Sequence, residues 1–302
     1  MFPESIMTTS RQPNIDKQLE ALPPLPITVS QVMEITADPL SSANDLMKAI
    51  LPDQAMCVAI LKIANSVLYG RPKKVASLES AIVVLGFDEI RNIVLGKAAV
   101  TTFSDIFKTR RAELERFWDH AFTCGLAARV IAEHLGLQSG QFFIAGLLHD
   151  FGKLAMLLAF DRRYDPDRWF SEISTTEHLA EEKALFSTTH AEVGSRLLHH
   201  WQFPDTLISS LRYHHAPEQA GKLVGYAMVV QLADFLTHCC ALPESPDDRA
   251  LRELLDRYLP GFLDSWHERK LPWEETTLEY LFAWLKVDRE HGSSILDILA
   301  SS

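Results

Sequence analysis

The chain has 302 residues, of which 47% are hydrophobic and 23% are charged, and its formal net charge at pH 7 is −11. This is the composition of a globular protein, and the length suggests two domains or one domain with two lobes. An acidic chain repels phosphate backbones, so general nucleic-acid binding is disfavoured. The tight basic cluster formed by Arg71, Lys73 and Lys74 is interpreted as a solvated loop.

The chain carries no pattern that targets it to a membrane or a secretory route. Met1–Ser10 lacks a basic region followed by an apolar core, and no apolar run reaches the length expected of a membrane span. Four cysteines, none in a C-x-x-C pair, are interpreted as reduced thiols: Cys57, Cys124, Cys239 and Cys240. We therefore expect a cytoplasmic protein that does not bind membranes.

The first part of the chain predicts an N-terminal helical lobe over residues 22–108. Residues 1–21 are polar and poorly patterned, and we expect them to be flexible. Leu22–Pro26 is a stiff, extended entry segment. Apolar residues then recur at three-and-four spacing, which predicts helices over 28–37, from a cap at Ser42 or Asn44, and over 55–66, 78–85 and 89–100.

Two of these helices are joined through a glycine and resemble the outline of a DNA-reading helix-turn-helix. Gly86 suits a left-handed C-cap and Asp88 suits the next N-cap. The second helix, Glu89–Val100, offers only Arg91 and Lys97 as cations and is otherwise apolar. This pattern favours packing into the core over contact with DNA.

A charged segment, Thr109–Glu115, marks the expected boundary of a second lobe over residues 109–242. Helices are predicted there over 117–136, 141–160, 187–202, 205–215 and 223–240, with Arg162–Arg168 as a polar loop. Residues 243–302 are expected to form a helical extension that packs against this lobe or serves as a dimer or partner surface. No stretch predicts a strand, so the fold class is all-α.

Several polar residues of the second lobe lie on the apolar faces of their predicted helices. His190 precedes Val193 and the rest of its apolar stripe by helical spacings, and His214 and His215 continue the buried face of their helix. His120 and Asp234 stand in the same relation to their own helices. Each residue alone is more typical of a hydrogen-bonded core side chain.

A fifth predicted helix also carries polar residues, at its end. In the segment His149-Asp150-Phe151-Gly152-Lys153 this apolar helix stops at His149 and Asp150. Polar groups from five helices cost several kcal/mol each to bury unless they are paired or coordinated. A divalent cation would satisfy imidazoles and carboxylates together, and this ligand set suits iron, manganese or zinc. The pattern as a whole predicts a metal site.

These residues resemble the HD-domain metal-dependent phosphohydrolases, and the N-terminal half narrows the resemblance to the HDOD family. The similar motifs are Leu61–Ser66, Ser77–Gly86, His190–Gly194, Trp201–Pro204 and His214-His215, and the resemblance runs from about residue 22 to 237. It implies an all-α protein of bacterial signal transduction. Many members have lost the metal ligands, which this sequence keeps.

The resemblance implies a ligand set and a mechanism. By position, four residues match the ligands of HD enzymes, and three histidines match additional ligands of the HD-GYP phosphodiesterases: His120, His149, Asp150 and Asp234, then His190, His214 and His215. Two ions would then share Asp150 as a bridging carboxylate, and Lys153 would neutralise the phosphate. His214 or His215 would bind the second ion or protonate the leaving oxygen.

The sequence also departs from the HD-GYP pattern. Ala216-Pro217-Glu218 follows the paired histidines in place of a glycine-tyrosine-proline loop, and Arg116 stands where some members place an acidic ligand. Three functions therefore remain open: hydrolysis of a phosphate ester or phosphodiester, a regulatory module with a structural or redox-sensing metal and a signalling protein partner, and a nucleotide receptor.

Overall fold

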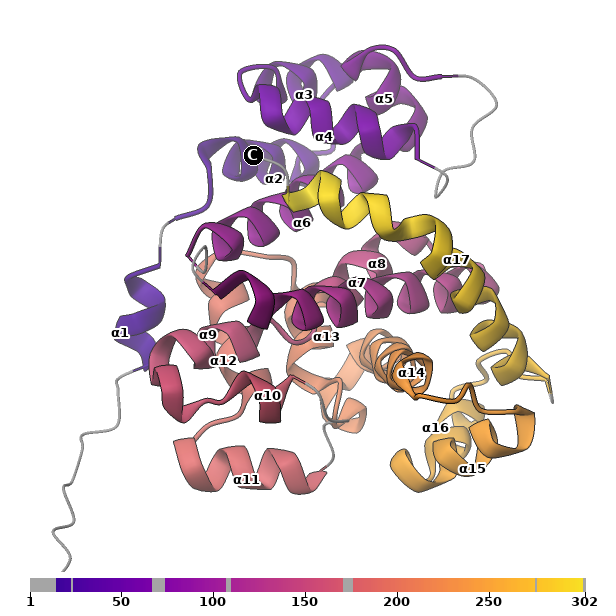
Figure 1. Cartoon of the computed structure of the whole chain (residues 1–302). Helices are drawn as coiled ribbons and strands as arrows, with labels where there is room; N and C mark the ends of the chain where they lie inside the picture. The colour runs from indigo at the N-terminus through magenta and orange to yellow at the C-terminus, as the bar shows by residue number, and fades with distance from the viewer. Residues whose placement is uncertain are drawn as a thin grey trace, which may run out of the picture.

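The protein folds as a set of packed helices (Figure 1). The structure, a computed structural model, describes residues 15–22, 24–66, 74–106, 110–170, 176–274 and 276–300. No strand occurs in these ranges, which confirms the predicted all-α fold class.

The region predicted as the N-terminal lobe, residues 22–108, contains five helices, and a short helix precedes it. They are α1 (Ile15–Glu20), α2 (Ile27–Ala37), α3 (Ala43–Ile50), α4 (Gln54–Ala64), α5 (Leu78–Leu85) and α6 (Phe87–Ile106). Of the two candidate N-caps of α3, Ser42 and Asn44, the structure shows Ser42, which forms a capping box with Asp45. The reciprocal bonds satisfy backbone donors that a helix start otherwise leaves open.

Two expectations at the chain start and at the α5–α6 turn need correction. Ile15–Glu20 is helical, because Ile15 and Leu19 are buried and α1 packs on α9 and α12, whereas a flexible segment was expected. Gly86 has a positive φ of 84° but a ψ of 169°, which is not the expected left-handed helical conformation, and α6 begins at Phe87. Asp88 therefore lies in the first turn and pairs with Arg91 at 2.9 Å.

The helix-turn-helix alternative does not fit this geometry. Lys97 is buried, at 4% exposure, and Arg91 is paired with Asp88, so α6 presents neither cation freely to a nucleic acid.

Asn65, which lies in one of the family-like motifs, fixes the position of the chain segment before α5 by hydrogen bonds. Its side-chain amide donates to the carbonyl of Val75 and accepts from the backbone N–H of Val75, both at 2.8 Å. Arg71 and Lys73 lie outside the described residues.

The region predicted as the second lobe, residues 109–242, contains the helices that carry the predicted polar residues. They are α7 (Arg111–His134), α8 (Ser139–Leu148), α9 (Phe151–Phe160), η3 (Asp161–Arg163), α10 (Pro166–Trp169), α11 (Thr176–Phe186), α12 (His190–His200), α13 (Asp205–Tyr213), η4 (Pro217–Leu223) and α14 (Val224–Ala241). The predicted helix over 141–160 is broken at His149-Asp150. The predicted polar loop contains α10, with Pro166 at its first turn, and α11 was not predicted.

The C-terminal extension is also helical, with α15 (Asp248–Tyr258), α16 (Phe262–Glu268) and α17 (Thr277–Ala300). In Figure 1, α17 runs along the molecule from the neighbourhood of α15 and α16 toward α2 and α6. It packs on α7 and reaches α6 and α4, and Leu299 near its end is buried. The extension therefore contacts both lobes.

One apolar core runs through both lobes and the extension, from Ile15 in α1 to Leu299 in α17. Two apolar stretches, Ser139–Phe160 and Pro217–Ala241, have the length and hydropathy of a membrane span, although no such run was expected from the sequence. Most residues in both stretches are buried inside the protein, and the first is interrupted at His149-Asp150. They are core helices of this fold.

Candidate metal centre

The junction between α8 and α9 is buried, and glycines allow the neighbouring helices to approach it. A Cβ atom on Gly152 would lie 1.7 Å from the carbonyl oxygen of His190, so only glycine fits between α9 and α12. A Cβ on Gly146 would lie 2.5 Å from the carbonyl oxygen of Cys124 in α7. These two close approaches bring the side chains of α7, α9 and α12 to one place.

The first group of side chains gathers around one oxygen of Asp150. His149 Nε2 lies 3.3 Å from His120 Nε2, 3.4 Å from Asp150 Oδ2 and 3.5 Å from Asp234 Oδ1. His120 Nε2 lies 3.1 Å from Asp234 Oδ1 and 3.8 Å from Asp150 Oδ2. The four residues that the resemblance assigned to an HD-type site are therefore neighbours in space.

The second group gathers around the other oxygen of Asp150. His190 Nε2 lies 3.3 Å and His214 Nε2 lies 3.8 Å from Asp150 Oδ1. His215 Nε2 lies 3.0 Å from His190 Nε2. All seven residues predicted as metal ligands thus form two adjoining groups, and the Asp150 carboxylate lies between them with one oxygen toward each.

Hydrogen bonds to the far ring nitrogens orient three of the imidazoles. Nδ1 of His149 donates to the carbonyl of Gly146 and Nδ1 of His214 to that of Leu211, both at 2.7 Å. Nδ1 of His190 donates to Glu182 Oε2 at 2.9 Å. Carbonyl and carboxylate oxygens only accept, so Nδ1 carries the proton and Nε2 is left to bind a cation.

The sequence analysis missed three residues at this site: Tyr164, Glu182 and His238. Glu182 of α11 is buried, receives Nδ1–H and the backbone N–H of His190, and accepts a hydrogen bond from the Tyr164 hydroxyl at 2.7 Å. No sequence pattern pointed to this contact. His238 Nε2 lies 3.2 Å from Asp234 Oδ1, and its spacing of four residues from Asp234 on one helix was a usable signal.

Burial and neighbouring charges set the protonation of the cluster. Burial opposes the charge of Asp150, but the Lys153 ammonium, 2.7 Å from Oδ2, holds the pKa of that carboxyl well below its usual value. Burial lowers the pKa of His120 to about 4 and that of His214 to about 3, so both are neutral at pH 7. Burial also opposes a charge on His149, yet Cys124 and Asp150 raise the pKa of this imidazole well above its usual value.

The donor set fits a divalent metal ion. Asp150 Oδ1, His214 Nε2 and Asp234 Oδ1 are buried and have no hydrogen bond of acceptable geometry among the described residues. Buried polar atoms are seldom left in this state, and a site for a bound ion is one of the physical reasons for it. The raised pKa of His149 shows that a positive charge is stabilised between the imidazoles and carboxylates. A proton on His149 supplies this charge when no metal ion is bound.

These features define a class of protein: an all-α protein with a buried histidine–aspartate cluster whose composition suits divalent metal ions. The profile of the HDOD domain matches residues 22–217, about two thirds of the chain. The chain therefore belongs to the HDOD family.

Solved structures share the fold at low sequence identity. A candidate phosphohydrolase from Shewanella amazonensis SB2B superposes with a TM-score of 0.67 and 19% identity, covering 95% of this chain and 98% of that one. A candidate signal transduction protein from Marinobacter aquaeolei VT8 gives 0.67 and 22%, covering 95% and 61%. An HDOD domain protein of unknown function from Geobacter sulfurreducens gives 0.62 and 22%, covering 95% and 98%.

An uncharacterized protein of Treponema pallidum (strain Nichols) is also similar in sequence. It is 24% identical over 231 residues, which are 72% of this chain and 43% of that protein. The chain thus spans less than half the length of the curated relative that it matches.

Proposed function

We propose that this protein is a metal-dependent phosphohydrolase or phosphodiesterase that works in bacterial signal transduction, in the cytoplasm. The observation that carries the proposal is the Asp150 carboxylate, which has one oxygen toward each of two imidazole groups. Two ions on such a site would polarise a phosphoryl oxygen and activate a water molecule. Two structural neighbours from Shewanella amazonensis SB2B, the one described above and a second with a TM-score of 0.61 and 22% identity, are named as candidate phosphohydrolases, which supports the same reaction class.

We assign the ligands by the two groups. His120, His149 and Asp234 would hold the first ion and His190, His214 and His215 the second, with Asp150 shared; iron, manganese or zinc suits these donors. Glu182 would orient His190 through its Nδ1–H. His238 adjoins the first group through Asp234.

The geometry also refines the roles of Lys153 and His215. Lys153 is buried and contacts Asp150, so we propose that it keeps the shared carboxylate ionised besides adding positive potential for a phosphate. The pKa of His215 is held well below its usual value by burial and by His214. A neutral imidazole suits a ligand better than a general acid.

Elemental analysis of protein purified without added metal, combined with turnover of bis(p-nitrophenyl) phosphate in Mn²⁺ or Fe²⁺, tests this proposal. We expect two divalent ions per chain and measurable turnover. His149→Ala and His190→Ala should each lower the metal content by about half, since each removes a ligand from one group. Full metal content in both variants would contradict the assignment.

A regulatory module without turnover is the second candidate. Several large apolar side chains of the N-terminal lobe are exposed, which favours a protein partner on that lobe. Bound metal with no turnover across metals, pH and phosphate esters would favour this function, with a signalling protein or a nucleotide as ligand.

A further inference from the structure

One pocket is lined both by a residue of the candidate metal centre and by residues of the C-terminal extension. It has a volume of about 550 Å³ and lies between η4 and α14 on one side and α15 and α16 on the other. His215, a member of the second imidazole group, lines it, together with Arg257 and Arg269 of the extension. A ligand in this pocket would therefore contact both the candidate metal centre and residues beyond the matched HDOD region.

The two arginines are cations without a carboxylate partner among the described residues, whereas Arg249 and Arg252 of the same extension are paired with glutamates. Arg269 is half-buried and donates from Nη1 to the carbonyl of Ser265 at 2.7 Å. Its Nε is buried and has no hydrogen-bond partner in the part of the chain that the structure describes. A guanidinium N–H that is buried and unpaired is suited to a ligand oxygen.

The remaining walls combine apolar and weakly polar surface. Tyr258, Phe262 and Met228 line the pocket, and the exposed Glu218 is an acidic residue on the side of η4. The volume lies in the range of small-molecule sites, which bind an apolar body with a few fixed polar groups. Two unpaired cations in a protein with a net charge of −11 favour an anionic ligand here.

We propose that the C-terminal extension completes the substrate pocket and that Arg257 and Arg269 bind a second anionic group of a phosphate ester whose other phosphate lies at the histidine–aspartate centre. The inference rests on the proposed function, because the metal centre would hold the first phosphate. It adds the substrate class: a compact molecule with two separated anionic groups and an apolar body.

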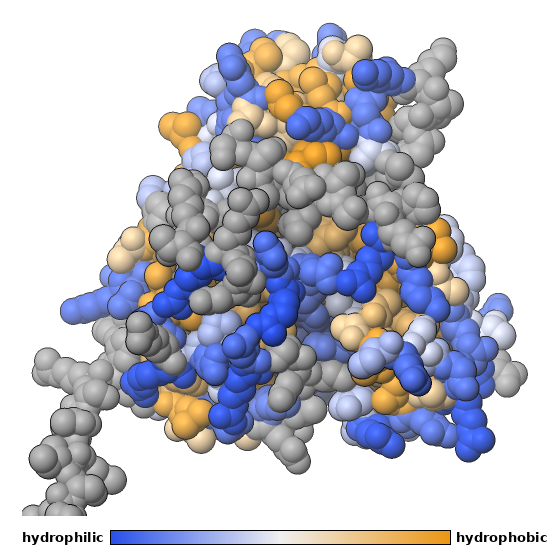
Figure 2. Space-filling model, viewed as in Figure 1, coloured by the Kyte–Doolittle hydropathy of each residue, from blue (hydrophilic) through white to orange (hydrophobic). Residues whose placement is uncertain are grey.

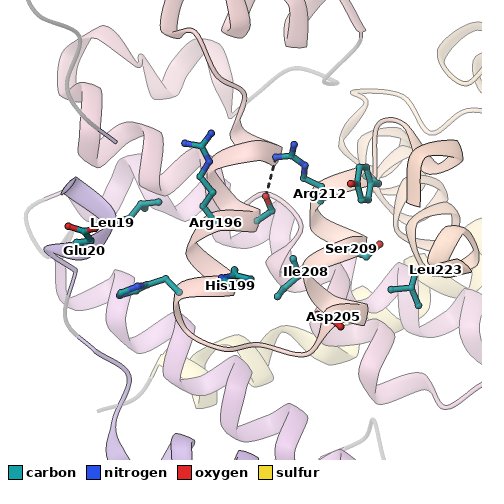
Figure 3. A pocket seen from close by; sticks show the side chains of 12 residues that line it. Leu19, Glu20, Arg196, His199, Asp205, Ile208, Ser209, Arg212 and Leu223 are labelled. Carbon is teal, nitrogen blue, oxygen red and sulfur yellow. Dashed lines mark hydrogen bonds between the residues drawn. The ribbon is translucent and has the colours of Figure 1, made fainter. Parts of the chain in front are cut away.

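A larger pocket of about 740 Å³ lies elsewhere, between α1, α12 and α13 (Figure 3). It also contains arginines, and Figure 3 shows the bond from Arg212 to the Ser195 hydroxyl, at 3.3 Å. None of the seven predicted metal ligands lines it. It therefore serves as the rival location for an anion.

The test compares two probes that differ by one phosphate, adenosine 5′-monophosphate and adenosine 3′,5′-bisphosphate, by calorimetric titration of the Mn²⁺-loaded full chain. We expect the bisphosphate to bind at least about tenfold tighter, the usual gain from a charge-assisted hydrogen bond. Arg257→Gln and Arg269→Gln should each bring the two affinities within about twofold. Arg249→Gln, which removes an arginine that is 90% exposed on α15, should leave the preference intact.

The outcomes separate this inference from the proposed function. Normal metal content and turnover of bis(p-nitrophenyl) phosphate with no preference for the bisphosphate overturn the inference alone. If Arg212→Gln abolishes the preference for the bisphosphate and Arg257→Gln does not, the second phosphate binds in the rival pocket. That result also overturns the inference. A preference lost in Arg257→Gln, in a chain that melts like the wild type but hydrolyses nothing, supports the pocket and contradicts the enzyme.

Discussion

The two lobes differ in which side chains they bury: the second lobe buries polar side chains, and the N-terminal lobe exposes apolar ones. In the second lobe, His149 and His214 are fully buried and Asp150 is 3% exposed. In the N-terminal lobe, Leu40 is 92% and Val83 is 73% exposed, and Figure 2 shows apolar residues reaching the surface at the top of the molecule. Buried charge requires specific partners, whereas exposed apolar groups are tolerated singly. The second lobe therefore buries its polar groups in specific contacts with one another, whereas the N-terminal lobe leaves large apolar side chains on its surface.

The largest effect should follow from Asp150→Ala. The substitution removes the shared carboxylate and leaves Lys153 buried without its counter-charge, so we expect loss of bound metal and destabilisation by roughly 3–5 kcal/mol. Elemental analysis and urea unfolding measure both. Asp256→Ala, at an exposed aspartate of α15, is the control and should change neither. Full retention of the bound metal in Asp150→Ala would remove the contrast between the lobes.

Acid should weaken the metal-free protein through the second lobe. Between pH 6.5 and 4 the unfolded chain protonates His120 and His214, whose folded pKa values are about 4 and about 3, while the folded chain does not. Stability therefore falls as pH falls through this window, by up to about 3 kcal/mol for His120 alone. His149, with its raised pKa, is protonated in the folded chain throughout this window, so it adds only a small slope of opposite sign near pH 6.5, where the unfolded chain is still being protonated.

Urea unfolding of chelator-treated protein at several pH values measures this dependence. In His120→Gln the fall between pH 6.5 and 4 should be smaller. An unchanged pH dependence in that variant would show that His120 is not held neutral by burial.

A moderate effect is expected from Ser42→Ala in the N-terminal lobe. The substitution removes the capping box of α3 and should lower stability by about 1 kcal/mol, with no change in metal content. Ser41→Ala, which removes the neighbouring hydroxyl, serves as the control in the same unfolding assay. A loss of metal in Ser42→Ala would mean that the lobes are coupled more tightly than their separate chemistry suggests.

The smallest effect on stability should come from Val83→Lys. Val83 is exposed on α5, so the free energy of unfolding should change by less than about 0.5 kcal/mol. Thermal melting checks this. A large destabilisation would place Val83 in a packed interface and would sharpen the case for a partner surface on this lobe.

Much of the fold could be predicted because helical periodicity is local. The spacing of apolar residues placed α2, α12, α13 and α14 within a few residues of their observed ends. The same spacing indicated that His190 faces the core. Local patterns failed to predict helices that depend on contacts with distant segments. The helix α1 is stabilised by packing on α9 and α12, and α11 has only a weak apolar stripe, so its sequence does not predict a helix.

The sequence by itself determined the helical class and the set of residues that are too polar for the faces they occupy, because residue type and helical spacing are fixed along the chain. Only the tertiary structure decided that Asp150 lies between two imidazole groups, that Glu182 orients His190 and that α15 and α16 enclose His215. These are contacts between distant segments, and close packing at Gly146 and Gly152 sets their distances.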